Sequence, residues 1–342
     1  MELGHSKESD AQPVPLVAVV TNPKSSTMLR RIEKVRAWVE RSFGVVHYEL
    51  ETIDDVHDAV EFFAHAKPAV IVINGGDGTV GAFIASLFYS GLMENPPPIA
   101  IVPGGKTNMT GADLGAKGRP EVMLEKILQL VRSPDFERHL SERYLIELDM
   151  QDGHLPYVGT FFGTAGIVRG IHWTRENAHK PGRPVWVSHI IALFSLLAAG
   201  LGLSRKNKDI LTSEHMDIYV KNGGRMSGKY ASVLATTLDE LVLGLRPYGK
   251  EGSGGLKFSA IQPGAGSLFR AAKGLITGAF GKKGITGVQV RRSDRIVIKG
   301  TDPVTLDGEI FFPTPGKDIT MVGIRKLTFV SFKKKDIRID ED

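Results

Sequence analysis

The chain of 342 residues contains no cysteine, which excludes a disulfide-stabilised scaffold, a thiolate metal site and a cysteine nucleophile. It has no large excess of one charge sign, because 43 basic residues face 38 acidic ones. A net charge of +5 favours an acidic partner only where basic residues gather on one face. The composition, 42% hydrophobic and 24% charged, is that of a globular protein and excludes a fibrous or wholly disordered chain.

Several familiar sequence signals are missing. Residues 1–14 are polar and lack the apolar core of a signal peptide, so we expect a disordered tail there. No GxxxxGK[ST] phosphate loop occurs, and no GxGxxG pattern follows the first predicted strand. No pattern of basic and aromatic residues indicates nucleic-acid binding. The sequence therefore argues against a P-loop ATPase, a dinucleotide-binding fold and a nucleic-acid partner.

One long hydrophobic run is present, the 19 uncharged residues 185–203. Its length approaches the roughly 20 residues of a membrane-spanning helix. It also contains Ser188, His189 and Ser195, which a spanning helix rarely needs. We expect a buried helix or one that lines an apolar cleft; a spanning helix and an interfacial helix are the alternatives.

The first 130 residues alternate short apolar runs with helix-periodic segments. Continuous apolar strands between helices are typical of a parallel sheet covered on both faces. The pattern predicts a doubly wound α/β domain. The expected strands are 16–20, 45–50, 69–73 and 99–102, and the expected helices are 26–43, 55–66, 79–90 and 121–131.

After about Leu145 the pattern changes to strands with two-residue alternation, separated by turn clusters. Strands in hairpins predict an antiparallel β domain. Between Ser267 and Gly300, eight basic residues face a single acid, Asp294. Residues 267–280 interleave such charges with large apolar residues, as in an amphipathic helix that binds an anionic lipid surface. A solvated face of a basic protein explains the same pattern.

The clearest chemical signal is a buried strand that ends in the loop Gly75-Gly76-Asp77-Gly78-Thr79. Glycines permit close backbone approach to a ligand, and the next helix N-terminus, with Thr79 as a candidate cap, offers amides to phosphate. Asp77 beside phosphate implies a metal bridge or a proton acceptor. A strand–turn–helix connection without a ligand is the alternative.

A second glycine loop, Pro103–Asn108, also follows a predicted strand directly. In an open α/β sheet, ligands lie beyond the carboxyl ends of the strands, where we expect both loops. Lys106 is then a cation that faces phosphate oxygens. A glycine loop with a lysine in solvent is the alternative.

Together these motifs resemble those of the diacylglycerol kinase catalytic-domain family, which includes bacterial lipid kinases, sphingosine kinases and ceramide kinases. The GGDGT loop alone is shared with NAD kinases and phosphofructokinases, but its combination with a later DGE motif is more specific. The resemblance extends from about Leu16 to Phe332. It rests on Asn22-Pro23-Lys24-Ser25, the GGDGT loop, Pro103, Gly105, Asn108 and Leu306-Asp307-Gly308-Glu309.

The resemblance implies an ATP-binding α/β domain at 15–144 and a β-sandwich with a lipid cleft at 145–316, with the chain returning to the first domain from about Lys317. It implies a kinase that uses ATP and Mg²⁺ to phosphorylate a lipid hydroxyl. Asp307 is implied as the general base, with Glu309 and Asp77 as catalytic residues that hold Mg²⁺. Nucleotide contacts are implied for Asn22, Thr52, Gly75, Gly76, Asp77, Gly78, Thr79, Lys106 and Thr107.

Two departures from the family pattern bear on the substrate and on metal binding. Met109 stands where the family usually has aspartate, and Lys106 where it has threonine; ceramide kinases share the loss of the acid. Residues 252–256 lack the acids that support a structural metal in bacterial relatives, which makes a structural Mg²⁺ doubtful here. Both changes favour ceramide or another sphingoid lipid slightly over diacylglycerol.

Other interpretations remain open. Asp307-Gly308 is also a typical type I′ hairpin turn, so a purely structural role is the alternative for that motif. An NAD kinase-like enzyme and a catalytically inactive lipid- or nucleotide-binding module are the alternative functions. We expect a cytoplasmic protein, peripheral at the inner face of the membrane through residues 267–300; the sequence leaves a homodimer open.

Overall fold

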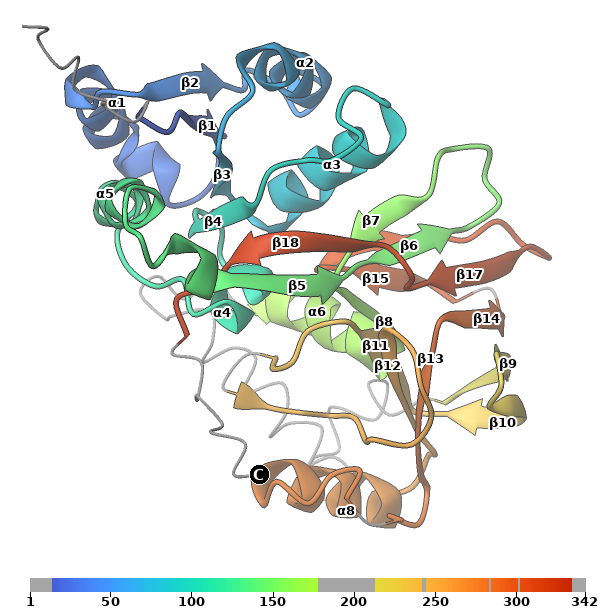
Figure 1. The fold of residues 1–342 in the computed structure, drawn as a ribbon. Helices are drawn as coiled ribbons and strands as arrows, with labels where there is room; N and C mark the ends of the chain where they lie inside the picture. Colours follow the sequence, from blue (N-terminus) through green and yellow to red (C-terminus); the bar gives the residue numbers. More distant parts are fainter. Residues whose placement is uncertain (1–13, 178–212, 242–243, 283, 301, 334–342) are drawn as a thin grey trace, which may run out of the picture.

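The computed structural model describes residues 14–177, 213–241, 244–282, 284–300 and 302–333 (Figure 1). The hydrophobic run 185–203 and nearly all of the expected N-terminal tail lie outside the described residues. Within the described part of the chain, no helix combines the length and the hydrophobicity that crossing a membrane requires. The described strands form three six-stranded sheets.

The first sheet has the strand order β2-β1-β3-β4-β18-β5. The strands pair in parallel from β2 to β18, and β5 pairs antiparallel with β18. Every residue of β1 and β3 is buried, as expected for central strands covered on both faces. The strands are β1 (Val17–Thr21), β2 (Val45–Glu49), β3 (Val70–Gly75), β4 (Ile99–Pro103), β5 (Leu140–Tyr144) and β18 (Lys326–Val330).

Helices cover both faces of this sheet. Ala18 and Ile71 belong to a hydrophobic cluster with α2 and α3, whereas their neighbours Val17 and Val70 belong to a cluster with α1 and α5. This alternation confirms the predicted doubly wound arrangement. The helices are η1 (Met28–Arg30), α1 (Ile32–Arg41), α2 (Val56–Ala66), α3 (Asp77–Tyr89), α4 (Met109–Asp113), α5 (Pro120–Val131) and η2 (Phe136–His139).

Some predicted boundaries were wrong. Helix α3 begins at Asp77, two residues earlier than expected, and its N-cap is Gly76, so Thr79 is not the cap. An acid in the first turn suits the positive end of the helix dipole, which favours the earlier start. The helix expected at 26–43 is divided into η1 and α1, and the short α4 was not predicted.

The other two sheets are antiparallel, with the orders β10-β9-β14-β17-β6-β7 and β13-β12-β11-β8-β15-β16. They share one hydrophobic cluster, which includes Ile218 and Met321 from one sheet and Phe162 and Phe258 from the other. This packing confirms the expected β-sandwich.

The strands of the sandwich are β6 (Ile146–Asp149), β7 (Tyr157–Gly159), β8 (Phe161–Ala165), β9 (Glu214–Val220), β10 (Gly224–Tyr230), β11 (Ser232–Thr236), β12 (Leu256–Ile261), β13 (Val288–Ser293), β14 (Arg295–Lys299), β15 (Val304–Leu306), β16 (Glu309–Phe311) and β17 (Asp318–Val322). Two helices accompany them, α6 (Gly166–Asn177), which was not predicted, and α8 (Ala265–Ile276), which was expected at 267–280.

A two-stranded ribbon links the first sheet to the sandwich. Strand β5 continues into β6, and β17 continues into β18. Strand β5 pairs antiparallel with β18, and β6 pairs antiparallel with β17. The Leu145 N–H donates to the Arg325 carbonyl at 3.1 Å where the ribbon crosses between the sheets. The division of the chain into domains at residue 144 stays a prediction.

A cluster of charged groups holds α4 against the sandwich. The carboxylate of Asp113, 1% exposed, accepts hydrogen bonds from Arg143 Nε at 2.9 Å and from the N–H groups of Asp239 and Glu240 at 3.1 and 2.9 Å. Arg143 also pairs with Asp239 at 3.1 Å, and the Lys257 ammonium pairs with Asp239 as well, at 2.7 Å. Each buried charge therefore has a partner of opposite sign.

Candidate active site

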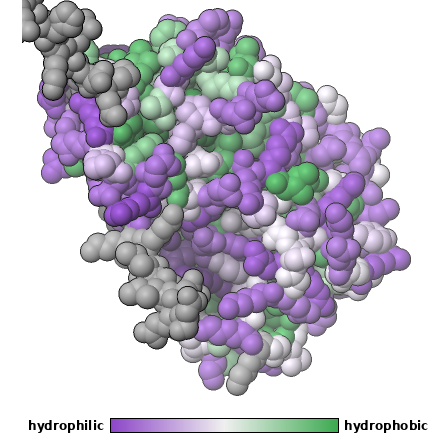
Figure 2. Space-filling view, in the orientation of Figure 1, coloured by the Kyte–Doolittle hydropathy of each residue, from purple (hydrophilic) through white to green (hydrophobic). Residues whose placement is uncertain are grey.

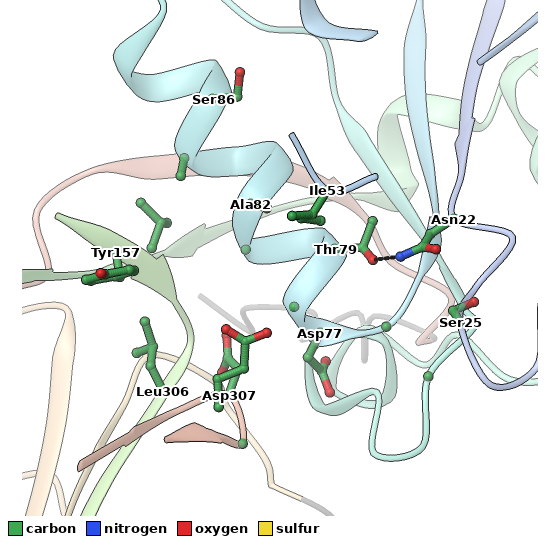
Figure 3. Close-up of a pocket in the computed structure, with 18 of the residues that line it drawn as sticks. Asn22, Ser25, Ile53, Asp77, Thr79, Ala82, Ser86, Tyr157, Leu306 and Asp307 are labelled. Atoms are coloured by element: carbon green, nitrogen blue, oxygen red, sulfur yellow. Dashed lines mark hydrogen bonds between the residues drawn. The ribbon is translucent and has the colours of Figure 1, made fainter. Parts of the chain in front are cut away.

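A cleft of about 1290 Å³ lies where the carboxyl ends of β1, β3 and β4 face the sandwich (Figure 3). One side, the loop wall, consists of cleft-lining residues in 22–29, 76–90 and 105–107. The other side, the hairpin wall, consists of residues 155–158, 306–309 and 311. A crevice at the carboxyl ends of parallel strands is the usual ligand site in such sheets.

The two glycine loops of the loop wall pack directly against each other. A Cβ on Gly105 would lie 2.6 Å from Gly76 Cα, and one on Gly104 would lie 2.9 Å from Gly75 Cα. The Gly104 N–H also donates to the Gly75 carbonyl at 2.8 Å. These glycines thus permit the loops to touch, and Gly76 also lines the cleft, whereas Gly75 does not appear in its lining.

The loop after β1, residues 22–25, is connected to the start of α3. Asn22 Nδ2 donates to Thr79 Oγ1 at 2.9 Å, a bond drawn in Figure 3, and Asn22 Oδ1 accepts the Lys24 N–H at 3.0 Å. Ser25 Oγ is buried and has no hydrogen-bond partner among the described residues. Because Ser25 lines the cleft, its hydroxyl is a candidate donor to a ligand.

The second glycine loop, residues 103–108, is closed by Asn108, which has a left-handed φ of 50°. Its side chain accepts from the Gly105 N–H and donates to the Gly105 carbonyl, both at 2.7 Å. Lys106 and Thr107 line the cleft between these anchors. Thr52 is outside the lining; its N–H and hydroxyl bind Asp55 at 2.8 and 3.0 Å, and the adjacent Ile53 lines the cleft instead.

Asp77 lies in the first turn of α3 and is 9% exposed. Its Oδ2 accepts the Met109 N–H at 3.2 Å, so this carboxylate binds the N-terminal end of α4. Burial raises the pKa of the Asp77 carboxyl to about 6, although the amides of Met109, Thr110 and Asn108 favour its charged form.

Asp307 and Gly308 form the two-residue turn between β15 and β16, with φ angles of 49° and 92°. Both signs are those of a type I′ turn, so the expected hairpin turn is confirmed. The Asp307 carboxylate nevertheless lines the cleft, where it accepts the Phe161 N–H at 2.8 Å and the Thr160 hydroxyl at 3.0 Å. Burial, followed by the charge of Asp77, raises the pKa of Asp307 to about 7.

Glu309 is exposed and points across the cleft to the loop wall. A Cβ on Gly78 would lie 2.5 Å from its Oε1, so the carboxylate lies against the first turn of α3. Asp77, Asp307 and Glu309 therefore border one cleft from two elements, as the labelled Asp77 and Asp307 show in Figure 3. The expected nucleotide residues Gly76, Gly78, Thr79, Lys106, Thr107 and Asn22 line the same cleft.

The acids suit a magnesium ion shared with phosphate groups. Mg²⁺ is usually held by one or two carboxylates together with substrate phosphates, which Asp77 and Glu309 could supply. Among the described residues, no group of three or more acidic or histidine side chains forms a metal cage of its own. At the candidate structural metal site, the acid-free segment 252–256 is followed by Lys257, whose ammonium binds Asp239, so these residues do not fit a metal.

Two threonines at the site were not predicted from the sequence. Thr160, between β7 and β8, binds Asp307, and Thr110 in α4 binds Thr160. Neither residue belongs to a glycine loop or an acidic motif, so no sequence pattern distinguishes them. Only the packing of α4 against the β7–β8 junction brings them together.

Comparisons with known proteins give a family for the first part of the chain and related folds for most of it. Residues 16–135 match the family model of the diacylglycerol kinase catalytic domain. No curated protein matches the chain.

Three solved structures from Bacillus anthracis str. Sterne share the fold. Two candidate diacylglycerol kinases have TM-scores of 0.62 and 0.64 and 17% identity, covering 93% of this chain and 96% and 97% of their own. A diacylglycerol kinase has a TM-score of 0.58 and 15% identity, covering 93% of this chain and 97% of its own. At such identities the likeness concerns the fold. Residues 16–135 therefore carry a diacylglycerol kinase catalytic domain, which supports a lipid kinase.

Proposed function

We propose that this protein transfers the γ-phosphoryl group of ATP to a hydroxyl group of a membrane lipid, with Asp307 as the general base. The observation that supports this most is the Asp307 carboxylate, which shares one cleft with both glycine loops. A base with a pKa near 7 is suited to proton abstraction at neutral pH, and burial raises the pKa of Asp307 to about 7.

The reaction is an in-line displacement at phosphorus. The lipid hydroxyl oxygen bonds to the γ-phosphorus while the bond to the β,γ-bridging oxygen breaks, which releases ADP. The hydroxyl proton passes to Asp307. Its Oδ1 accepts the Phe161 N–H and the Thr160 hydroxyl, whereas Oδ2 accepts the Thr160 N–H at 3.0 Å. Oδ2 is therefore the oxygen that we assign to the proton.

The loop wall supplies groups for the triphosphate. The N-terminus of α3, a helix of 13 residues, offers backbone amides, and the unpaired Ser25 hydroxyl offers a donor. Lys24 and Lys106 also line the cleft and carry positive charge. Asp77 and Glu309 would hold Mg²⁺, which when bound would neutralise charge on the phosphoryl oxygens.

We propose ceramide or another sphingoid lipid ahead of diacylglycerol as the acceptor. Met109 lacks the acid of the diacylglycerol kinase pattern, as ceramide kinases do, and Thr107 stands where ceramide kinases have a threonine. Helix α4 begins at Met109, and its backbone N–H, rather than a side-chain carboxylate, faces Asp77. Position 109 therefore supplies no carboxylate beside Asp77. The substrate comparison tests whether this loss accompanies a preference for ceramide.

We also propose that α8 brings the protein to an anionic membrane from the cytoplasmic side. Phe269 and Ile276 are 48% and 65% exposed, two turns apart on the helix, and Arg270 and Lys273 are exposed beside them. Figure 2 shows hydrophobic side chains among hydrophilic ones at the end of the molecule where α8 lies. Such a surface combines apolar insertion with attraction to anionic lipid.

The first experiment is transfer of labelled phosphate from ATP with Mg²⁺ to diacylglycerol, monoacylglycerol, ceramide, sphingosine and NAD, followed by thin-layer separation. A labelled lipid that is absent with Asp307→Asn supports the kinase and identifies its substrate. Full turnover by Asp307→Asn would assign the base to another group, with Asp77 next. Label only in NAD would support an NAD kinase, and ATP binding without turnover would support an inactive module.

Vesicle binding tests the role of α8. Sedimentation with vesicles that contain anionic lipid should decrease for Arg270→Glu/Lys273→Glu and with rising salt, because exposed charges are screened over about 8–10 Å. Binding that is insensitive to salt but lost in Phe269→Ser would show that apolar insertion dominates. The double variant Lys117→Glu/Arg138→Glu, on two exposed residues outside α8, is the control, because it changes the net charge by the same amount.

A further inference from the structure

Thr160 is held from several sides at the junction between β7 and β8. Its side chain is buried, with 2% of the residue exposed. Its carbonyl accepts the Thr236 hydroxyl at 2.9 Å and the Thr237 N–H at 3.0 Å. Its N–H and hydroxyl both donate to Asp307, so the carboxylate is bound to a residue that is itself fixed.

The Thr160 hydroxyl also contacts a second hydroxyl. Thr110 Oγ1 lies 3.0 Å from Thr160 Oγ1, and Thr110 is 2% exposed. A hydroxyl has one proton to donate, and that of Thr160 is directed to Asp307 Oδ1 at 3.0 Å. Thr160 therefore accepts the proton of Thr110, which gives a directed chain from Thr110 through Thr160 to Asp307.

The chain of hydroxyl groups begins in α4, the helix that also binds Asp77. The Met109 N–H donates to Asp77 at 3.2 Å, and the next residue, Thr110, begins the hydroxyl chain. Asp77 belongs to the loop wall and Asp307 to the hairpin wall. Two adjacent residues of α4 thus connect the carboxylates on opposite sides of the cleft.

We infer that Thr110 and Thr160 are positioning residues, which orient the Asp307 carboxylate and set its place relative to the loop wall. The inference rests on the proposed role of Asp307. The hydroxyl bond holds Oδ1, and Gly159 leaves room beside the other oxygen, because a Cβ there would lie 2.6 Å from Oδ2. Without the hydroxyl, the carboxylate keeps its backbone bonds but can turn about its terminal torsion.

The test uses pairs of variants that separate the hydroxyl from the methyl group. Thr160→Val keeps the shape and removes the hydroxyl, and Thr160→Ser keeps the hydroxyl. We expect Thr160→Val to lower kcat by about 10–100-fold, as loss of a supporting hydrogen bond does, with KM for ATP changed less than about 2-fold. Thr160→Ser should recover most of the wild-type kcat.

Thr110→Val should lower kcat by roughly 3–10-fold, because it acts on the carboxylate only through Thr160. Thr110→Ser is its control. The double variant Thr110→Val/Thr160→Val should be no slower than Thr160→Val, since the two residues form one chain. Each variant is also measured for its thermal midpoint and for ATP binding by calorimetry.

Several results would overturn the inference. A wild-type kcat in Thr160→Val, or a Thr160→Ser enzyme as slow as Thr160→Val, would show that the hydroxyl does not position the base. If Thr160→Val does not fold, a wild-type kcat in Thr110→Val overturns it. Asp307→Asn is assayed in parallel: its full turnover would refute the base itself, whereas its inactivity beside a fully active Thr160→Val would refute only the role of the threonines.

Discussion

The loop wall and the hairpin wall of the cleft offer different kinds of groups to a ligand. The loop wall presents backbone from two glycine loops that pack too closely to admit a Cβ between them, with Lys24 and Lys106 at its border. The hairpin wall presents the side chain of Asp307, which backbone and hydroxyl donors hold. Loop geometry therefore sets the first wall and hydrogen bonds to one side chain set the second, so different substitutions should damage each.

The largest effect is expected beside the cleft, where charged groups hold α4 against the sandwich. Asp113→Ala removes the acceptor of Arg143 and of two backbone N–H groups, so we expect a loss of about 3–5 kcal/mol in the free energy of unfolding. Urea denaturation measures this loss. Asp135→Ala, which breaks an ion pair with Arg138 that is largely exposed, should cost less than about 1 kcal/mol. Equal losses in the two variants would contradict the role of the cluster.

The next prediction damages the loop wall alone. Gly105→Ala forces its Cβ to 2.6 Å from Gly76 Cα, so the loops must separate. We expect a loss of about 1–3 kcal/mol in stability, the usual cost of overpacking, together with weaker ATP binding. Gly284→Ala, where a Cβ has no neighbour within 4 Å among the described atoms, is the control. ATP binding equal to that of the control would show that loop contact is not needed.

A third prediction concerns the hairpin wall, where a substitution is expected to raise the stability of the protein instead of lowering it. In the folded protein the pKa of Asp307 is raised from 3.8 to about 7, so its contribution to stability is present at low pH and is lost as pH rises through about 7. Asp307→Asn lacks this loss. In chelator-treated protein, its thermal midpoint should exceed that of the wild type by a few degrees at pH 8 and by less at pH 5, where less of this loss has occurred. A constant difference across this range would contradict the prediction.

The smallest effect is expected at the exposed border of the loop wall. Lys106→Met removes a charge that solvent screens, so KM for ATP should rise by only about 3–5-fold, with kcat nearly unchanged. Lys117→Met, at an exposed lysine outside the cleft lining, is the control and should leave KM unchanged. A loss of kcat instead would mean that Lys106 acts on the transferred group.

The sequence predicts the first sheet well, because β1 and β3 are unbroken apolar runs and their helices have clear periodicity. It fails for short elements such as α4, a helix of five residues, where contacts with Arg143 and Asp239 outweigh local propensity. Antiparallel strand order in the sandwich depends on pairings between residues far apart, which no local pattern specifies.

The site follows the same division. The glycine loops can be predicted from their residues, because they directly follow strand ends. Asp307 was expected in the site only from the family resemblance, since its own pattern indicates a hairpin turn. Thr52 was expected to bind nucleotide, yet it binds Asp55 while Ile53 lines the cleft. A difference of one residue along a loop reverses which side chain faces the cleft. Thr110 and Thr160 are 50 residues apart, and only tertiary packing reveals their contact.

The ribbon formed by β5–β6 and β17–β18 has a mechanical consequence. Its two strands cross from the first sheet to the sandwich side by side, and they are hydrogen-bonded to each other through Leu145 and Arg325. Two adjacent connections that are bonded together resist twisting and sliding but allow bending about one axis. We therefore expect any movement of the first sheet relative to the sandwich to widen or narrow the cleft without shifting one wall along the other.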